Sequence, residues 1–298
     1  MSTKGCLAVA VAGLAAALPA TSAADFNQGT ANGITYINDQ TSVPAGQASA
    51  PAAECLPGSH LIGAAADSLD SGSAGILSSL RADDDDDGNA TRDDGVTAFT
   101  HNTTGAGAGS HVWAFCATGK VRYPTRTTQL ELGDTRAIKA KCPAGTKVLS
   151  GGFYLDGLNS QVHLNAMRPI DDSDDGAQPD DGWQVRVTNL AGADKLYQAW
   201  AFCRADIKPR YLDAASTVNA GDVDFASLSC PTQSRSVAGV GGEVRGDPDG
   251  RRISGIEPAD DTSQGEPDTF PDDRAFIEVD NPTASEASFT INLICTRL

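Results

Sequence analysis

The stretch Trp113-Ala114-Phe115-Cys116 returns 87 residues further along the chain as Trp200-Ala201-Phe202-Cys203. Upstream of these two copies the sequence aligns with itself without a gap for more than sixty residues, and a more divergent third copy ends at Cys295. A repeat of this size identifies the building unit of a fold. We therefore expect three β units, which span residues 34–118, 119–206 and 207–298.

Six of the seven cysteines follow the same repeat. Taken as successive pairs along the chain, they are separated by 61, 61 and 65 residues. Each bridge within such a pair would close a loop of about 62 residues and stabilise the fold by about 4 kcal/mol. The simplest pairing for a duplicated unit joins Cys55 to Cys116, Cys142 to Cys203 and Cys230 to Cys295.

The N-terminal segment has the composition of a secretory signal. Lys4 precedes an apolar run over residues 7–18, and small residues follow it. The run is too short to span a bilayer comfortably. We expect residues 1–24 to be a signal peptide that removes Cys6 from the mature chain, and residues 25–33 to be a flexible lead-in. The mature protein is then secreted, into a compartment where disulfides persist.

The local pattern inside a unit is that of β-strands. From Trp183 to Asn189, apolar residues alternate with polar ones, as in a strand with one buried face. Residues 197–203 are apolar on both faces, which is typical of a central strand. Each unit holds about six such stretches and no convincing helix. We therefore expect an all-β fold of three tandem β-sandwich-like repeats, each with one disulfide.

The second unit carries a recognisable pattern. Its parts are a Cys-Pro-x-Gly start at residues 142–145, the pair Gly151-Gly152, the strand Gly-Trp-x-Val-x-Val-x-Asn at residues 182–189, and a closing Ala-x-Cys at residues 201–203. This pattern resembles a repeat in uncharacterised secreted proteins of actinobacterial type. The resemblance implies secretion and a β unit, and it implies no known activity. The third unit departs from the pattern, because Gln233 replaces the glycine of the start.

A second and weaker likeness concerns the arrangement of the three units. The chain is similar to the three-sided β-prisms of the egg vitelline-layer type, which also pack three similar sheets, although their repeats are much shorter. This likeness implies a single three-fold β-prism as the alternative to three separate sandwiches.

The charge of the chain excludes several classes of partner. The formal net charge is −17, and the acids are 32 Asp against 7 Glu. A nucleic-acid-binding protein needs positive charge to displace counterions, so DNA and RNA are excluded as partners. Anionic membrane surfaces are disfavoured for the same reason, and no long apolar run outside the N-terminal segment predicts membrane insertion.

A run of aspartates in the first unit is the sharpest motif for a metal. Asp83, Asp85, Asp87 and Asp94 fall at positions 1, 3, 5 and 12 of an EF-hand-like loop, with a glycine at position 6. Carboxylates spaced in this way can wrap one calcium ion. Position 12 is Asp rather than the usual Glu, and the flanks do not look helical. The alternative is therefore a solvated acidic loop, which is what charge runs usually form.

The sequence contains no recognisable catalytic constellation. All mature cysteines are assigned to disulfides, and there is no Gly-x-Ser-x-Gly elbow, His-Glu-x-x-His helix or phosphate loop. We therefore expect no enzyme, and instead a secreted binding or adhesion protein for an extracellular carbohydrate or protein, calcium-assisted in one version. Trp183 is the best candidate for an exposed ligand-binding ring, with core packing as its alternative. The rival functions are a structural envelope-associated protein and a secreted hydrolase that uses Asp pairs.

Overall fold

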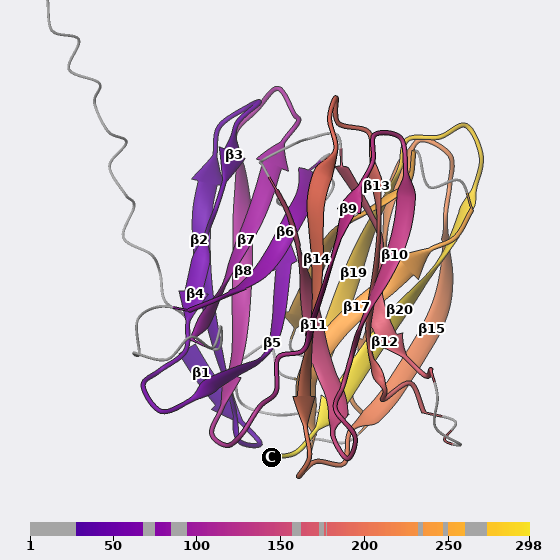
Figure 1. Ribbon diagram of the computed structural model, residues 1–298. Coiled ribbons are helices and arrows are strands. Elements are labelled where there is room, and N and C mark those ends of the chain that lie inside the picture. Colours follow the sequence, from indigo (N-terminus) through magenta and orange to yellow (C-terminus); the bar gives the residue numbers. More distant parts are fainter. Residues whose placement is uncertain are drawn as a thin grey trace, which may run out of the picture.

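The computed structural model describes residues 28–67, 75–84, 94–156, 162–172, 176, 178–231, 235–246, 250–259 and 273–298. The predicted signal peptide lies outside these ranges. All regular secondary structure within these ranges is β-strand, which confirms the all-β class (Figure 1). Over the same ranges, no helix is long and apolar enough to cross a membrane.

The strands follow the three predicted units. Strand β1 (Gln28–Ala31) precedes the first unit, which contains β2 (Ile34–Val43), β3 (Ala48–Ser49), β4 (Ala52–Glu54), β5 (His60–Asp67), β6 (Gly75–Asp83), β7 (Gly95–Asn102) and β8 (Ala108–Ala117). The second contains β9 (Thr125–Leu130), β10 (Thr135–Lys141), β11 (Lys147–Leu155), β12 (Val162–Ile170), β13 (Gly182–Asn189) and β14 (Lys195–Arg204). The third contains β15 (Arg210–Val218), β16 (Asp222–Ser229), β17 (Ser236–Val244), β18 (Arg252–Ala259), β19 (Arg274–Asn281) and β20 (Ala287–Thr296).

The strands form three antiparallel sheets, and each sheet is shared by two units. Sheet A has the order β1-β2-β8-β5-β18-β19-β16, so it joins half of the first unit to half of the third. Sheet B, β3-β7-β6-β11-β14-β9, joins the first unit to the second. Sheet C, β10-β13-β12-β17-β20-β15, joins the second to the third. The seams are the pairs β5–β18, β6–β11 and β12–β17.

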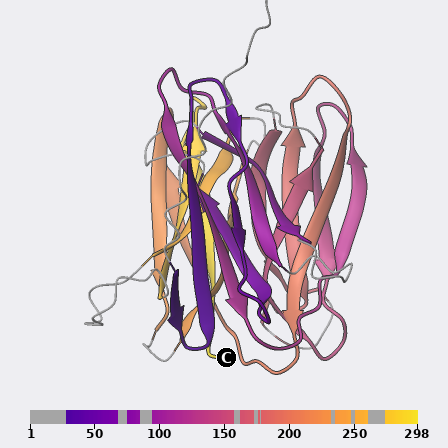
Figure 2. The ribbon, with the colours of Figure 1, turned by 90° about the vertical axis from the view of Figure 1, so that its left-hand side faces the viewer.

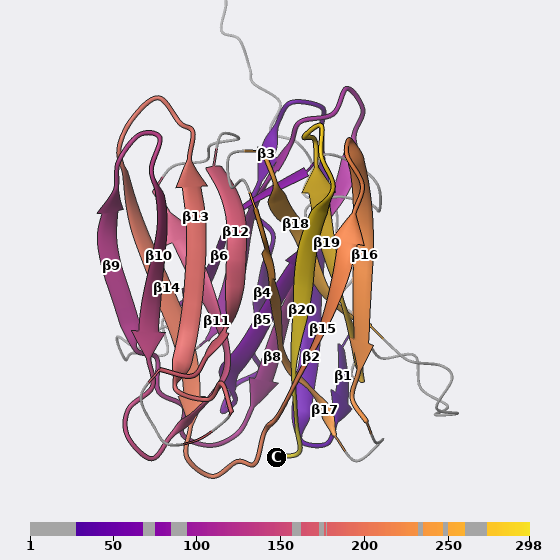
Figure 3. The same ribbon diagram turned by 90° about the vertical axis from the view of Figure 1, so that its right-hand side faces the viewer.

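This sharing decides between the two predicted arrangements. Each repeat is sandwich-like, because its two halves lie in different sheets that pack against each other. However, both layers of every sandwich continue into a neighbouring unit, so the three repeats form one three-fold prism rather than separate bodies. Figures 2 and 3 show the orange and yellow strands of the third unit beside the indigo strands of the first.

The strand periodicity explains which faces are buried. In β13 the side chains of Trp183, Val185 and Val187 are all buried, as the alternation predicts. Strand β14 pairs on both sides, with β11 and with β9, which agrees with its apolar residues on both faces. The lead-in prediction for residues 25–33 is wrong for its described part, because Gln28–Ala31 pairs with β2 as the edge strand β1. Backbone hydrogen bonds to β2 hold this segment in place.

The three units meet at the strands β5, β11 and β17, which lie against one another. Each of these strands has a β-bulge near its start, after Leu61, Val148 and Val237 respectively. At the bulges backbone meets backbone: a Cβ added to Gly63 would lie 2.1 Å from the carbonyl oxygen of Ala238. A bulge turns the strand locally and permits this close approach.

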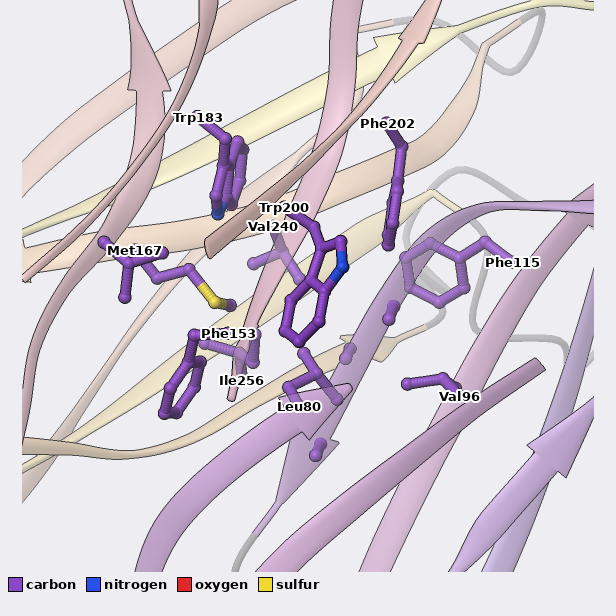
Figure 4. Close-up of a cluster of buried hydrophobic side chains, with 14 of the residues drawn as sticks. Leu80, Val96, Phe115, Phe153, Met167, Trp183, Trp200, Phe202, Val240 and Ile256 are labelled. Carbon is purple, nitrogen blue, oxygen red and sulfur yellow. The ribbon is translucent and has the colours of Figure 1, made fainter. Parts of the chain in front are cut away.

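A continuous apolar core fills the space between the sheets. Figure 4 shows side chains from all three units in one cluster, with Leu80 and Phe115 from the first, Trp200 from the second and Ile256 from the third. All four side chains are at most 1% exposed. The three units therefore contribute to one shared apolar core.

Three repeated tyrosines close the contact between units in a ring. The hydroxyl of Tyr36 donates to the carbonyl of Val237 (2.6 Å), so the first unit bonds to the third. Tyr123 and Tyr211 make the equivalent bonds to Leu61 (2.7 Å) and Val148 (2.8 Å), from the second unit to the first and from the third to the second. Each tyrosine thus binds the residue that precedes the bulge of the neighbouring unit.

The ring predicts a specific cost for removing one hydroxyl. Tyr123→Phe should lower the free energy of unfolding by about 1–2 kcal/mol, because the carbonyl of Leu61 loses its partner inside the protein. Tyr154→Phe is the matched control, since the hydroxyl of Tyr154 donates to Asp156 at an exposed site. Urea unfolding of the two variants measures the difference. Equal stability of both variants would contradict a structural role for the ring.

The three disulfides have the predicted pairing, and they connect the sheets. Cys55–Cys116, Cys142–Cys203 and Cys230–Cys295 have Cα–Cα distances of 5.6, 5.7 and 5.8 Å. In each pair the second cysteine lies in the last strand of its unit, and the first follows a strand of another sheet. The bridges therefore link sheet B to A, sheet C to B and sheet A to C.

Candidate functional site

One described aspartate beside each acidic stretch occupies an equivalent place in the three units. In each unit the backbone N–H of the first disulfide cysteine donates to a loop aspartate carbonyl: Cys55 to Asp94 (2.6 Å), Cys142 to Asp181 (2.8 Å) and Cys230 to Asp273 (2.6 Å). The backbone of these three aspartates is thus bonded directly to the first cysteine of each disulfide.

The candidate calcium ligands are only partly brought together. Asp85 and Asp87 lie outside the described residues. The carboxylate of Asp83 pairs with Arg81 at 2.8 Å and also accepts a hydrogen bond from the hydroxyl of Thr97. A guanidinium therefore already occupies the place beside Asp83 where a cation would bind. Among the residues that the structure describes, no three His, Cys, Asp or Glu side chains form a group that could hold a metal ion.

In the second unit, an aspartate beside the acidic stretch is also paired with basic side chains of the protein itself. Asp172 forms ion pairs with Lys139 (2.7 Å) and Lys141 (2.6 Å). The hydrogen bonds from Lys139 and Lys141 lower the pKa of Asp172 to about 2. In the second unit, Asp172 is therefore the ionic partner of two lysines on β10.

Trp183, the candidate ligand-binding ring, is a core residue. Its side chain is 0% exposed, so a role at the surface is excluded. The physical reason is the glycine opposite it: a Cβ on Gly151 would lie 2.3 Å from the indole, so the ring rests directly on the backbone of β11. Gly151 serves as a socket for Trp183, which explains why a glycine stands inside a buried strand.

One pocket of the structure lies on sheet A, across the seam between the first and third units. Five neighbouring strands place five residues in one cross-strand row, in the order His111, Asp67, Gly255, Glu278 and Phe225. Glu257 and Phe276 form the next row on the same face. These seven residues line a pocket of about 230 Å³.

Gly255 forms the floor of this pocket. Because glycine has no side chain, the row has a gap between two carboxylate residues at this point. A Cβ here would lie 2.6 Å from the Oδ1 atom of Asp67, so any other residue would fill part of the pocket. Phe225 bounds the pocket on the edge strand β16 and is 42% exposed, which makes it one of the few large apolar side chains open to solvent.

Three carboxylates line the pocket, and they are only partly accessible to water. Glu278 is only 4% exposed and accepts a hydrogen bond from the hydroxyl of Ser254 at 2.6 Å. Burial raises the pKa of Glu257 above its ordinary value of 4.5. With Asp67, three acids therefore face one small volume.

The raised pKa of Glu257 predicts a pH-dependent cost. When the folded pKa of an acid exceeds the unfolded one, the folded state binds the proton more strongly, and stability falls as the pH rises from the unfolded towards the folded pKa. Glu257→Gln should therefore raise Tm by a few degrees at pH 7, and the gain should disappear near pH 4. Thermal melts of the variant and the wild type at both pH values measure this. A gain that is equal at both pH values would contradict the burial explanation.

The equivalent place on sheet C holds arginines of the chain itself. The register aligns Asp67 with Glu243, Glu257 with Arg168 and Glu278 with Arg186. There Glu243 pairs with Arg168 (3.2 Å) and with Arg186 (3.0 Å). One carboxylate and two guanidinium groups thus replace the three carboxylates of sheet A.

Sheet B fills the same place with an arginine between aromatic rings. Arg81 aligns with Glu257, and its guanidinium carbon lies 5.7 Å from the ring centres of both Phe99 and Tyr154. Two of the three seams therefore contain a guanidinium from the protein itself. On sheet A, both positions that carry arginine on sheet C carry glutamate.

Sequence reasoning missed this pocket, although one signal for it was present. Arg81 and Arg168 match each other in the repeat, and the third unit breaks the match with Glu257. The consequence of that change depends on Asp67 and His111, which belong to another unit and reach the pocket only through the shared sheet.

Comparisons with known proteins add no assignment for this site. No protein-family model matches the chain, and no curated protein matches it.

Proposed function

We propose that this protein is a secreted, non-catalytic binding protein that holds its ligand in the pocket over Gly255 on sheet A. One observation carries the proposal: the same place is filled by Arg168 and Arg186 on sheet C, whereas on sheet A it is a pocket of about 230 Å³. A concave site with an exposed ring and a few convergent polar groups is the usual form of a ligand site.

The extracellular location is supported by the disulfides and by the N-terminal sequence. Three disulfides between the sheets are typical of proteins that work in oxidising compartments. The first 24 residues have the order of charge, apolar run and small residues that directs export. The resemblance to a repeat of secreted proteins points in the same direction.

The binding proposal is tested by a ligand screen read out on individual residues. Backbone amide NMR of the mature chain is recorded with a library of sugars, amines and carboxylic acids. We expect the bound compounds to shift the signals of Gly255 and its neighbours on β5 and β19. Ligand-induced shifts elsewhere only, or no shifts with any compound, would overturn the proposal, and the second result would favour the structural envelope-associated alternative.

A secreted hydrolase is the second candidate, and Glu257 is the observation that favours it. A partly buried acid with a raised pKa beside further carboxylates has the character of a general acid. Turnover of a glycoside or peptide by the wild type, abolished in Glu257→Gln, would support this candidate against the non-catalytic one.

Calcium is not needed by the proposed binding site. Because Asp83 is already paired with Arg81, we expect added calcium, followed by a chelator, to leave Tm unchanged. A scanning melt of the mature chain in both conditions measures this. A rise in Tm with calcium that the chelator reverses would instead support the calcium-assisted version, with Asp85 and Asp87 as further ligands.

A further inference from the structure

The seams of sheets B and C contain guanidinium groups, whereas no arginine among the described residues lines the pocket of sheet A. On sheet C the carboxylate of Glu243 binds two of them, and on sheet B Arg81 lies between two rings. On sheet A, Asp67 stands at the position of Glu243, and glutamates occupy the positions of the arginines. We propose, on the basis of the binding function above, that the sheet A pocket takes the guanidinium group of an arginine side chain from a partner protein.

The charges in the pocket suit such a cation. Asp67, Glu257 and Glu278 line the same volume, and Glu278 is 96% buried. Carboxylates that are held together with little access to water gain much from an opposite charge. Guanidinium is planar and weakly hydrated and presents several N–H groups at once, so it can bind two carboxylates together, whereas an ammonium acts as a point charge.

The rings in the pocket suit the same group. Phe225 and Phe276 line it on the side of the edge strand β16. Sheet B shows that a guanidinium at this seam can lie against aromatic rings, because Arg81 lies over Phe99 and Tyr154 there, although these rings stand at the positions of Glu278 and Asp67. Arg274 already lies 4.7 Å from the ring centre of Phe276 and donates to Ser227, and it does not line the pocket.

The net charge of the protein favours a basic partner over a neutral one. At −17, the chain attracts positively charged surfaces over long distances and raises their association rate. The pocket itself accommodates one side chain, so the partner is recognised through a single protruding arginine.

The direct test compares two peptides that differ only in this group. The mature protein is titrated calorimetrically, at low salt, with acetyl-Gly-Arg-Gly-amide and with the same peptide carrying citrulline, which has the same shape without the charge. We expect the arginine peptide to bind at least about tenfold more tightly, because it forms charged hydrogen bonds. Equal binding of both peptides, or binding of neither, would overturn the inference.

Variants locate the binding at the seam of sheet A. Asp67→Asn and Glu257→Gln should each weaken the arginine peptide by about tenfold. Glu243→Gln, at the equivalent position of sheet C, is the matched control and should leave the affinity unchanged. Loss of affinity in the control alone would overturn the assignment to sheet A. Thermal melts confirm that each variant is folded.

One further substitution copies the other two seams into sheet A. Glu257→Arg places an arginine where sheets B and C carry Arg81 and Arg168. It should abolish peptide binding and raise Tm, because the new guanidinium would pair with the neighbouring acids. Retained binding in this variant would contradict the inference. Binding of a sugar or an acid over Gly255 in the NMR screen, without binding of the arginine peptide, would show that the proposed ligand class is wrong and that the binding function holds. If no compound binds there, both the arginine inference and the binding function are wrong.

Discussion

Gly63→Ala is expected to destabilise the protein by more than about 3 kcal/mol, although it adds a single methyl group. The new Cβ would lie 2.1 Å from the carbonyl oxygen of Ala238 and 2.7 Å from the ring of Phe115. The carbonyl belongs to the backbone of the neighbouring unit and cannot rotate away. The methyl group would therefore push the first and third units apart at the place where all three meet.

The measurement is urea unfolding of the variant beside two controls. Gly192→Ala should be neutral, because a Cβ there meets nothing within 4 Å. Ser150→Ala should be neutral or slightly stabilising, since Ser150 stands at the position equivalent to Gly63 and its buried hydroxyl has no hydrogen-bond partner among the described residues. If Gly63→Ala unfolds at the same urea concentration as Gly192→Ala, the close contact between the units is not present in solution.

Loss of one disulfide is the second large effect that we expect. Replacing Cys142 and Cys203 together by alanine should lower the free energy of unfolding by about 4 kcal/mol, because the bridge closes a long loop in the unfolded chain. The same bridge links sheet C to sheet B, so its loss also removes the covalent connection between these two sheets. Thermal melts of the double variant, and of the wild type with and without reductant, measure the effect.

The equivalent double variants provide an internal comparison. Because the three bridges link the sheets in a ring, removal of Cys55–Cys116 or of Cys230–Cys295 should cost a similar amount. A wild type whose Tm does not respond to full reduction would contradict this account. A digest of the unreduced protein in which Cys116 is joined to Cys142 would contradict the pairing itself.

The predictable parts of the fold are those that produce a pattern in the local sequence. Alternation from Trp183 to Asn189 identified β13, and apolar residues on both faces identified β14 as an interior strand. The disulfide pairs followed from the equal spacing of duplicated units. The same local signals could not place Trp183 at the surface or in the core, because its burial depends on Gly151 in a different sheet.

The candidate site was not predictable in the same way. Asp83 was identified by its spacing from other aspartates, and spacing does not reveal that Arg81 and Thr97 already satisfy it. Asp67 and Glu257 were not identified, because they are far apart in the chain and belong to different repeats. Each is an ordinary acid until the seam β5–β18 brings both into one pocket.

By itself, therefore, the sequence determined the strands, the three units and their disulfides, since periodicity and duplication act within a unit. Only the tertiary structure decided that the units share their sheets and that a pocket forms at the seam of sheet A. The physical reason lies in how the seams form: the bulged strands β5, β11 and β17 meet at the centre and pair with strands of other units. Those contacts form between distant segments and leave no periodic pattern in either one.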